Sequence, residues 1–112
     1  MFDIPENMTE NYVKLASLHE LSTSKLKRVT IDNQDICLAY IDGNVYAVDD
    51  MCSHEDASLS KGSLHENCVK CPLHGSRFDL KTGVALDEPA EDPINTYEVK
   101  VVDDDILVNL QD

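Results

Sequence analysis

Two short Cys–His pairs constrain this chain more than any other feature. The first pair is Cys52 and His54, and after sixteen further residues the second pair follows as Cys71 and His74. Two thiolates and two imidazoles suit either a zinc ion or a two-iron cluster. A Cys2His2 zinc finger places both cysteines on one arm and both histidines on the other. Here each arm carries one of each, which favours an asymmetric pair of irons over zinc.

The residues around the second pair strengthen the iron–sulfur interpretation. It lies in the run CPLHGSRFD, residues 71–79, and Thr82 and Gly83 follow shortly after it. Together with the C-x-H before it, this run is similar to the cluster-binding motif of Rieske proteins. The resemblance to small Rieske-type ferredoxins extends over nearly the whole chain. It implies a [2Fe–2S] cluster whose buried iron is held by Cys52 and Cys71 and whose outer iron is held by His54 and His74.

The length of 112 residues predicts a single domain, residues 1–112. The resemblance implies an all-β, antiparallel Rieske fold with a base β-sandwich and a cluster-binding insert over about residues 50–80. Alternating patterns and turn residues predict a matching series of short strands. They cover residues 12–16, 25–31, 36–41, 44–48, 68–71, 76–80, 96–102 and 106–110.

Local signals place several connections between these strands. Ser17 is a predicted N-cap for a short helical turn through Leu21. Residues 32–35 and the pair Asp42-Gly43 read as turns. Pro89–Pro93 resembles the proline-bearing loop that lies beside the two cluster loops in this family. An ordinary linker held extended by proline is the alternative for that segment.

The remaining cysteines and histidines are interpreted as bystanders. Cys37 lies in a predicted strand and reads as a small core residue. Strand alternation turns Cys68 away from the face shared by Val69 and Cys71, so Cys68 is expected to be a packed or half-exposed thiol. His19 has no Cys or second His close by in sequence and is expected at the surface of its helical turn, and His65 is expected to be solvated at a hairpin tip.

Charge and composition narrow the class of partner. The formal net charge of −13 disfavours nucleic acid and anionic membranes. It suits a small carrier steered to basic patches on other proteins, although solubility alone would also explain it. No basic leader and no apolar run of about eighteen residues is present in the sequence. We therefore expect a cytoplasmic monomer with reduced cysteines and no membrane anchor.

Two departures from the Rieske proteins of bc-type complexes bear on the reduction potential. Those proteins carry an extra cysteine in each loop, joined as a disulfide, where this chain has Ala57 and Leu73. They also carry a Tyr that donates a hydrogen bond to a cluster ligand, where this chain has Phe78, although Ser76 remains as a possible donor. Fewer hydrogen bonds to sulfur lower the potential, so we expect roughly −150 mV rather than +300 mV.

The resemblance implies an electron carrier and not an enzyme. Such a ferredoxin takes one electron from a flavoprotein reductase and delivers it to a terminal oxygenase. The alternative is a small electron-transfer subunit of a larger complex such as a nitrite reductase. A catalytic oxygenase would need a further iron held by two histidines and a carboxylate. Only His19 and His65 are left for that role, and the chain is too short for a catalytic domain.

Overall fold

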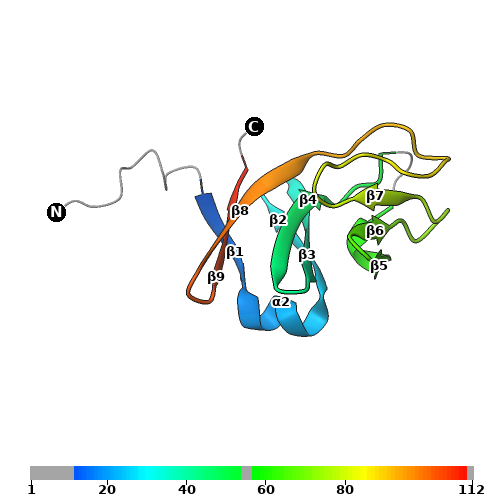
Figure 1. Ribbon diagram of the computed structural model, residues 1–112. Helices are drawn as coiled ribbons and strands as arrows, with labels where there is room; N and C mark the ends of the chain where they lie inside the picture. The colour runs from blue at the N-terminus through cyan, green and yellow to red at the C-terminus, as the bar shows by residue number, and fades with distance from the viewer. Residues whose placement is uncertain (1–11, 54–56, 111–112) are drawn as a thin grey trace.

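The computed structural model describes residues 12–53 and 57–110 of the chain. These residues form nine strands, one α-helix and one 3-10 turn, arranged antiparallel throughout (Figure 1). In chain order the elements are β1 (Tyr12–Ser17), α2 (Leu18–Ser24), β2 (Leu26–Ile31), β3 (Gln34–Ile41), β4 (Asn44–Asp49), η1 (Leu59–Lys61), β5 (Ser63–His65), β6 (Cys68–Lys70), β7 (Arg77–Asp79), β8 (Thr96–Val102) and β9 (Asp105–Asn109).

The strands form a six-stranded sheet and a separate three-stranded sheet. The larger sheet has the order β1-β9-β8-β4-β3-β2, and the smaller has the order β5-β6-β7. Only two residue pairs join β4 to β8, so the larger sheet folds into two halves at that seam. Apolar side chains of both halves, with Leu21 of α2, meet in what we call the base core: Ala16, Leu21, Ile36, Leu38, Ala47, Ile106 and Val108. This packing of one half on the other is the expected base β-sandwich.

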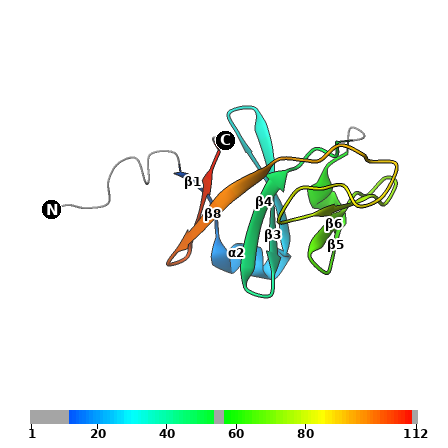
Figure 2. The same ribbon diagram turned by 45° about the horizontal axis from the view of Figure 1, so that its top comes forward.

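The smaller sheet lies at one end of the base, and a second core connects the two (Figures 1 and 2). Strand β3 is buried on both faces, because Ile36 and Leu38 enter the base core while Cys37 and Ala39 point the other way. The side chains on that other face make up what we call the insert core: Cys37, Ala39, Val48, Cys52, Ala57, Leu59, Val69, Cys71, Phe78, Leu80, Ala90 and Ile94. The expected core role of Cys37 is confirmed.

The observed strands agree with the predicted ones to within two residues at every end. Strand β3 begins two residues early because Asp32 and Asn33 both adopt positive φ, of 51° and 65°, and complete the turn in two residues. The predicted N-cap at Ser17 is confirmed, since its Oγ accepts a hydrogen bond from the Glu20 N–H at 3.1 Å. The helix continues beyond Leu21 to Ser24. Strand β5 and the 3-10 turn η1 were not predicted.

None of the helices in residues 12–53 and 57–110 is long and apolar enough to cross a membrane.

Gly62 is required where η1 passes over the smaller sheet. A Cβ atom added at this position would lie 1.9 Å from the carbonyl oxygen of Lys70. The contact is with backbone, so no side-chain rotation relieves it. We expect Gly62→Ala to lower the free energy of unfolding by about 1–3 kcal/mol.

Urea unfolding of the cluster-loaded protein would measure this loss. Ser63→Ala is the matched control, because Ser63 is the exposed neighbour of Gly62. Equal stability of Gly62→Ala and Ser63→Ala would show that the close approach of η1 to Lys70 does not constrain the fold.

Candidate metal centre

The first ligand loop, residues 51–58, follows directly after the end of β4 (Figure 1). An isolated bridge between Met51 and Ser58 closes it, and the Cys52 N–H donates to the Ala57 carbonyl at 2.9 Å. These contacts turn Cys52 inward, where only 3% of its surface is exposed. The predicted ligand His54 belongs to the same loop but lies outside the described residues.

The second ligand loop, residues 71–76, joins β6 to β7. The Cys71 N–H donates to the Ser76 carbonyl at 2.8 Å, and the Gly75 N–H donates to the Cys71 carbonyl at 3.1 Å. Gly75 has a φ of +78°, which a glycine adopts without strain. The loop is therefore a tight turn that buries Cys71, with 2% of its surface exposed, and leaves His74 exposed.

The burial of these side chains fits the donor set of an asymmetric two-iron cluster. Cys52 and Cys71 come from different loops and belong to the same insert core, whereas His74 faces solvent. Among the described residues, no three His, Cys, Asp or Glu side chains gather as ligands of a single metal ion. A cluster in which each iron takes only two protein ligands does not need such a group.

The proline loop, residues 89–93, is tied to both ligand loops. The Ser53 hydroxyl donates to the Asp92 carbonyl at 2.5 Å, and the Ala90 N–H donates to the Ser76 Oγ at 3.2 Å. The position implied by the resemblance is therefore confirmed, and the linker alternative is wrong. Positions 57 and 73 hold Ala and Leu, and none of the four cysteines forms a disulfide that would join the two ligand loops. Two serine hydroxyls connect the three loops in its place.

A half-exposed ion pair holds the chain that leads into the proline loop. The Arg77 guanidinium donates to both oxygens of Asp87, with Nε to Oδ2 at 2.6 Å and an Nη to Oδ1 at 3.1 Å. The hydrogen bond from Arg77 holds the pKa of the Asp87 carboxyl below its usual range. Since Arg77 starts β7 directly after the second ligand loop, this pair fixes the proline loop relative to Cys71 and His74.

Two further side chains, Ser76 and Phe78, bear on the expected reduction potential. Ser76 is 1% exposed, and its Oγ accepts from Ala90, which leaves its hydroxyl hydrogen available to a neighbouring acceptor. Phe78 is fully buried in the insert core with Cys52 and Cys71, and its ring has no hydroxyl to donate. Only one of the two side-chain donors found in the bc-type proteins is therefore present.

The bystander assignments agree with the structure. Cys68 is buried but stays outside the insert core that contains Val69 and Cys71. Burial, with a contribution from the negative charge of Asp79, raises the pKa of the Cys68 thiol. Both His19 and His65 are exposed.

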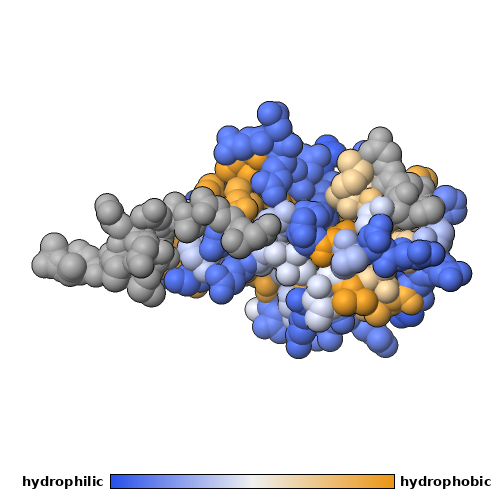
Figure 3. Space-filling view, turned by 90° about the horizontal axis from the view of Figure 1, so that it is seen from above, coloured by the Kyte–Doolittle hydropathy of each residue, from blue (hydrophilic) through white to orange (hydrophobic). Residues whose placement is uncertain are grey.

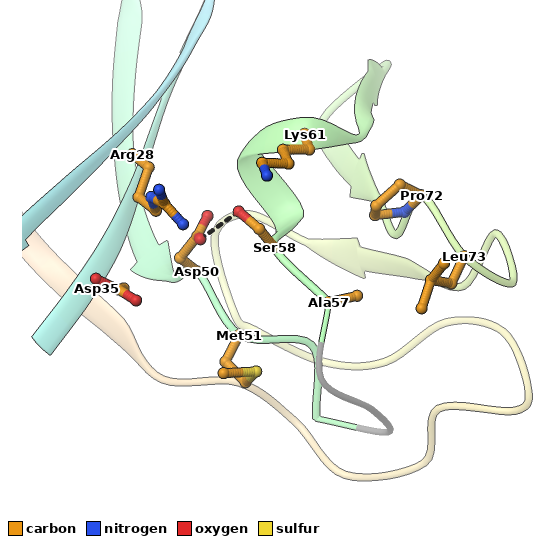
Figure 4. Close-up of a pocket in the computed structure, with 9 residues that line it drawn as sticks. All are labelled: Arg28, Asp35, Asp50, Met51, Ala57, Ser58, Lys61, Pro72 and Leu73. Atoms are coloured by element: carbon orange, nitrogen blue, oxygen red, sulfur yellow. Dashed lines mark hydrogen bonds between the residues drawn. The ribbon is translucent and has the colours of Figure 1, made fainter.

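One structural residue beside the site was not predicted from the sequence. Asp50 is the residue before Met51, and only 2% of its surface is exposed. Its carboxylate accepts a hydrogen bond from the Ser58 hydroxyl (Figure 4). It also accepts one from the Ser60 N–H at 2.9 Å. The sequence does show an aspartate next to a ligand loop. Its hydrogen-bond partners Ser58 and Ser60, however, come close to it only when the loop closes.

Comparison with known proteins identifies relatives over most of the chain. Residues 11–98 match the model of the Rieske [2Fe–2S] domain. The ferredoxin component of the naphthalene 1,2-dioxygenase system of Pseudomonas aeruginosa is 35% identical, over 92% of this chain and 99% of that protein. The 3-phenylpropionate/cinnamic acid dioxygenase ferredoxin subunit of Photorhabdus laumondii is 49% identical, over 70% of this chain and 75% of that protein.

Solved structures show the same fold. The ferredoxin of carbazole 1,9a-dioxygenase from Nocardioides aromaticivorans superposes with a TM-score of 0.85 at 31% identity, covering 90% of this chain and 99% of that one. A chain from a complex of oxygenase and ferredoxin in carbazole 1,9a-dioxygenase gives 0.83 at 26% identity, covering 90% and 94%. A candidate small subunit of an NADPH nitrite reductase gives 0.73 at 32% identity, covering 87% and 96%. Together with the buried thiols and the exposed histidine, these matches place the chain in the Rieske [2Fe–2S] domain family.

Proposed function

We propose that Cys52 and Cys71 hold one iron of the [2Fe–2S] cluster and that His54 and His74 hold the other. The support is the common burial of the two thiols, the exposure of His74, and the tight closure of both ligand loops. Bound in this way, the cluster accepts and releases one electron. All 112 residues then form one Rieske domain, with the cluster-binding insert over about residues 50–80.

The chain's own residues suit a carrier that transfers an electron with little rearrangement. The insert core keeps water from Cys52 and Cys71, while the three connected loops hold the ligand positions before and after transfer. The exposed His74 gives the outer side of the site a short path to a docked partner. Electron exchange between proteins requires such a short distance between the two redox centres.

The function supported best is that of a ferredoxin that passes one electron to a terminal oxygenase. The single observation that carries it is the match over 99% of the naphthalene dioxygenase ferredoxin component. The electron is taken from a flavoprotein reductase, and the carrier acts as a cytoplasmic monomer. The terminal oxygenase, and not this chain, performs the oxidation of the apolar substrate.

A permanent subunit of a reductase complex is the second candidate. Two observations favour it: the similarity to a nitrite reductase small subunit, and several exposed apolar side chains on and after the ligand loops. These side chains are Met51, Leu73, Val84 and Leu86. Figure 3 shows mostly hydrophilic residues on one face, with hydrophobic residues in small patches. A shuttle fits this surface better than a stable interface, which buries a large continuous patch.

The ligand assignment predicts which cysteines the cluster needs. Cys52→Ser and Cys71→Ser should abolish cluster binding, because a hydroxyl is a poor substitute for a thiolate on iron. Cys37→Ala and Cys68→Ala are the matched controls and should keep the cluster. Iron and sulfide analysis, with the EPR signal of the reduced protein, would measure the outcome. Loss of the signal in Cys68→Ala would show that the ligands are assigned wrongly.

A second prediction concerns the acidic surface beside the site. Glu91 and Asp92 are both exposed, and the Asp92 carbonyl contacts the first ligand loop through Ser53. The sequence places a second acidic pair, Glu55 and Asp56, in the first ligand loop, and we expect it near the same end of the site, but it lies outside the described residues. We expect Glu91→Gln/Asp92→Asn to slow electron transfer to a basic acceptor, cytochrome c, by about two- to fivefold at low salt. The difference should vanish at high salt, because the Debye length falls to about 3 Å at about 1 M ionic strength.

The control for this experiment removes the same charge at the opposite end of the molecule. Asp103→Asn/Asp104→Asn changes the β8–β9 turn, which lies away from the smaller sheet (Figure 1). Stopped-flow rates over a series of salt concentrations would compare the two double variants. Equal slowing of both, or no dependence on salt, would leave solubility as the role of the negative charge.

A further inference from the structure

Asp50 is a buried acid that forms hydrogen bonds through its carboxylate, its backbone carbonyl and its backbone N–H. Its carboxylate accepts from the Ser58 hydroxyl and from the Ser60 N–H at 2.9 Å. Its backbone carbonyl accepts from the Leu59 N–H at 2.6 Å, and its own N–H donates to the Asp35 carbonyl at 3.2 Å. Asp50 therefore binds the start of η1 by side chain and by main chain.

These bonds fix the two ends of the first ligand loop. Asp50 precedes the loop, and Ser58, the last loop residue, is bound by both the Asp50 carboxylate and the bridge to Met51. Ser58 and Ser60 lie with their Oγ atoms 2.9 Å apart, so the carboxylate orders both hydroxyls. A loop closed at its base in this way presents Cys52 to the insert core in one position.

The carboxylate also lies close to the core that contains the two thiols. Asp50 is only two residues from Cys52, whose side chain belongs to the insert core. After burial, the negative charge of Asp50 is also the second cause that raises the pKa of the Cys37 thiol in the same core. Asp50 lines a pocket together with Arg28 and Lys61 (Figure 4). A buried negative charge near a cluster opposes the addition of an electron.

We propose that Asp50 is the positioning residue of the first ligand loop and that its negative charge lowers the reduction potential of the cluster. The two parts are separable, because an amide of the same shape keeps most of the bonds and loses the charge. In Asp50→Asn, Oδ1 still accepts from the Ser60 N–H, and Nδ2 donates to the Ser58 Oγ. The Ser58 hydroxyl then donates to Ser60 instead. The proposal concerns the cluster and does not depend on which partner the ferredoxin serves.

The test measures cluster loss and potential in the same set of variants. Asp50→Ala removes both carboxylate bonds and should lose its cluster to a chelator on the order of tenfold faster than the unmodified protein. Asp50→Asn should keep the cluster and favour reduction by about threefold to tenfold, where tenfold corresponds to about 59 mV for one electron. Protein-film voltammetry and the bleaching of visible absorbance would supply the two readouts.

Asp49 provides a matched control one residue away. Its carboxylate also accepts two hydrogen bonds, from the Tyr97 hydroxyl at 2.6 Å and the Asn95 N–H at 2.9 Å. It points toward β8, on the opposite side of β4 from η1. Asp49→Asn should therefore shift the potential clearly less than Asp50→Asn.

Two results would overturn the proposal. One is an unshifted potential in Asp50→Asn, or a shift equal to that of Asp49→Asn, with the cluster spectrum intact. The other is a rate of cluster loss in Asp50→Ala equal to that of the unmodified protein. If Asp50→Asn holds no cluster, Ser58→Ala decides, since it keeps the charge and removes one bond. Ser58→Ala should lose its cluster faster than the unmodified protein, with an unchanged reduction potential. An unchanged rate of cluster loss would contradict the positioning role of Asp50.

Discussion

The burial of two thiols from separate loops in one core is the constraint on which the rest of this structure depends. Cys52 and Cys71 must leave water together, although each lies in a short loop that packs little surface of its own. The fold meets this requirement by extending a core from the central strand β3 into the smaller sheet. Apolar burial of Leu59, Val69 and Phe78 then holds the two loops against each other.

Polar contacts add to this apolar packing and hold the loops in place. Each ligand loop is closed by its own backbone hydrogen bonds, and the proline loop is bound to both through Ser53 and Ser76. Asp50 closes the base of the first loop, and the Arg77–Asp87 pair fixes the approach to the proline loop. These bonds join segments that no disulfide connects, so the loops hold their geometry by many small contacts. Such an arrangement leaves His74 at the surface.

Much of this arrangement could be predicted from the sequence because its signals are local. Alternating side chains and turn residues located eight of the strands, and the Cys–His spacing with the run CPLHGSRFD indicated the family. Strand β5 and the turn η1 were missed, whereas the equally short strands β6 and β7 were located because they flank the second Cys–His pair in the run that indicated the family. The bonds of Asp50 and of Ser53 were missed because their partners are distant in sequence, 10 and 39 residues away for Ser60 and Asp92. Such pairs meet only in the folded chain.

The central claim is that this chain carries one electron on a two-iron cluster held by two thiolates and two imidazoles. Combined iron, acid-labile sulfide and zinc analysis of the anaerobically purified protein, with a reductive titration, tests it most directly. A Rieske domain should contain two irons and two sulfides per chain and take up one electron. One zinc per chain, with no sulfide and no electron uptake, would contradict the claim.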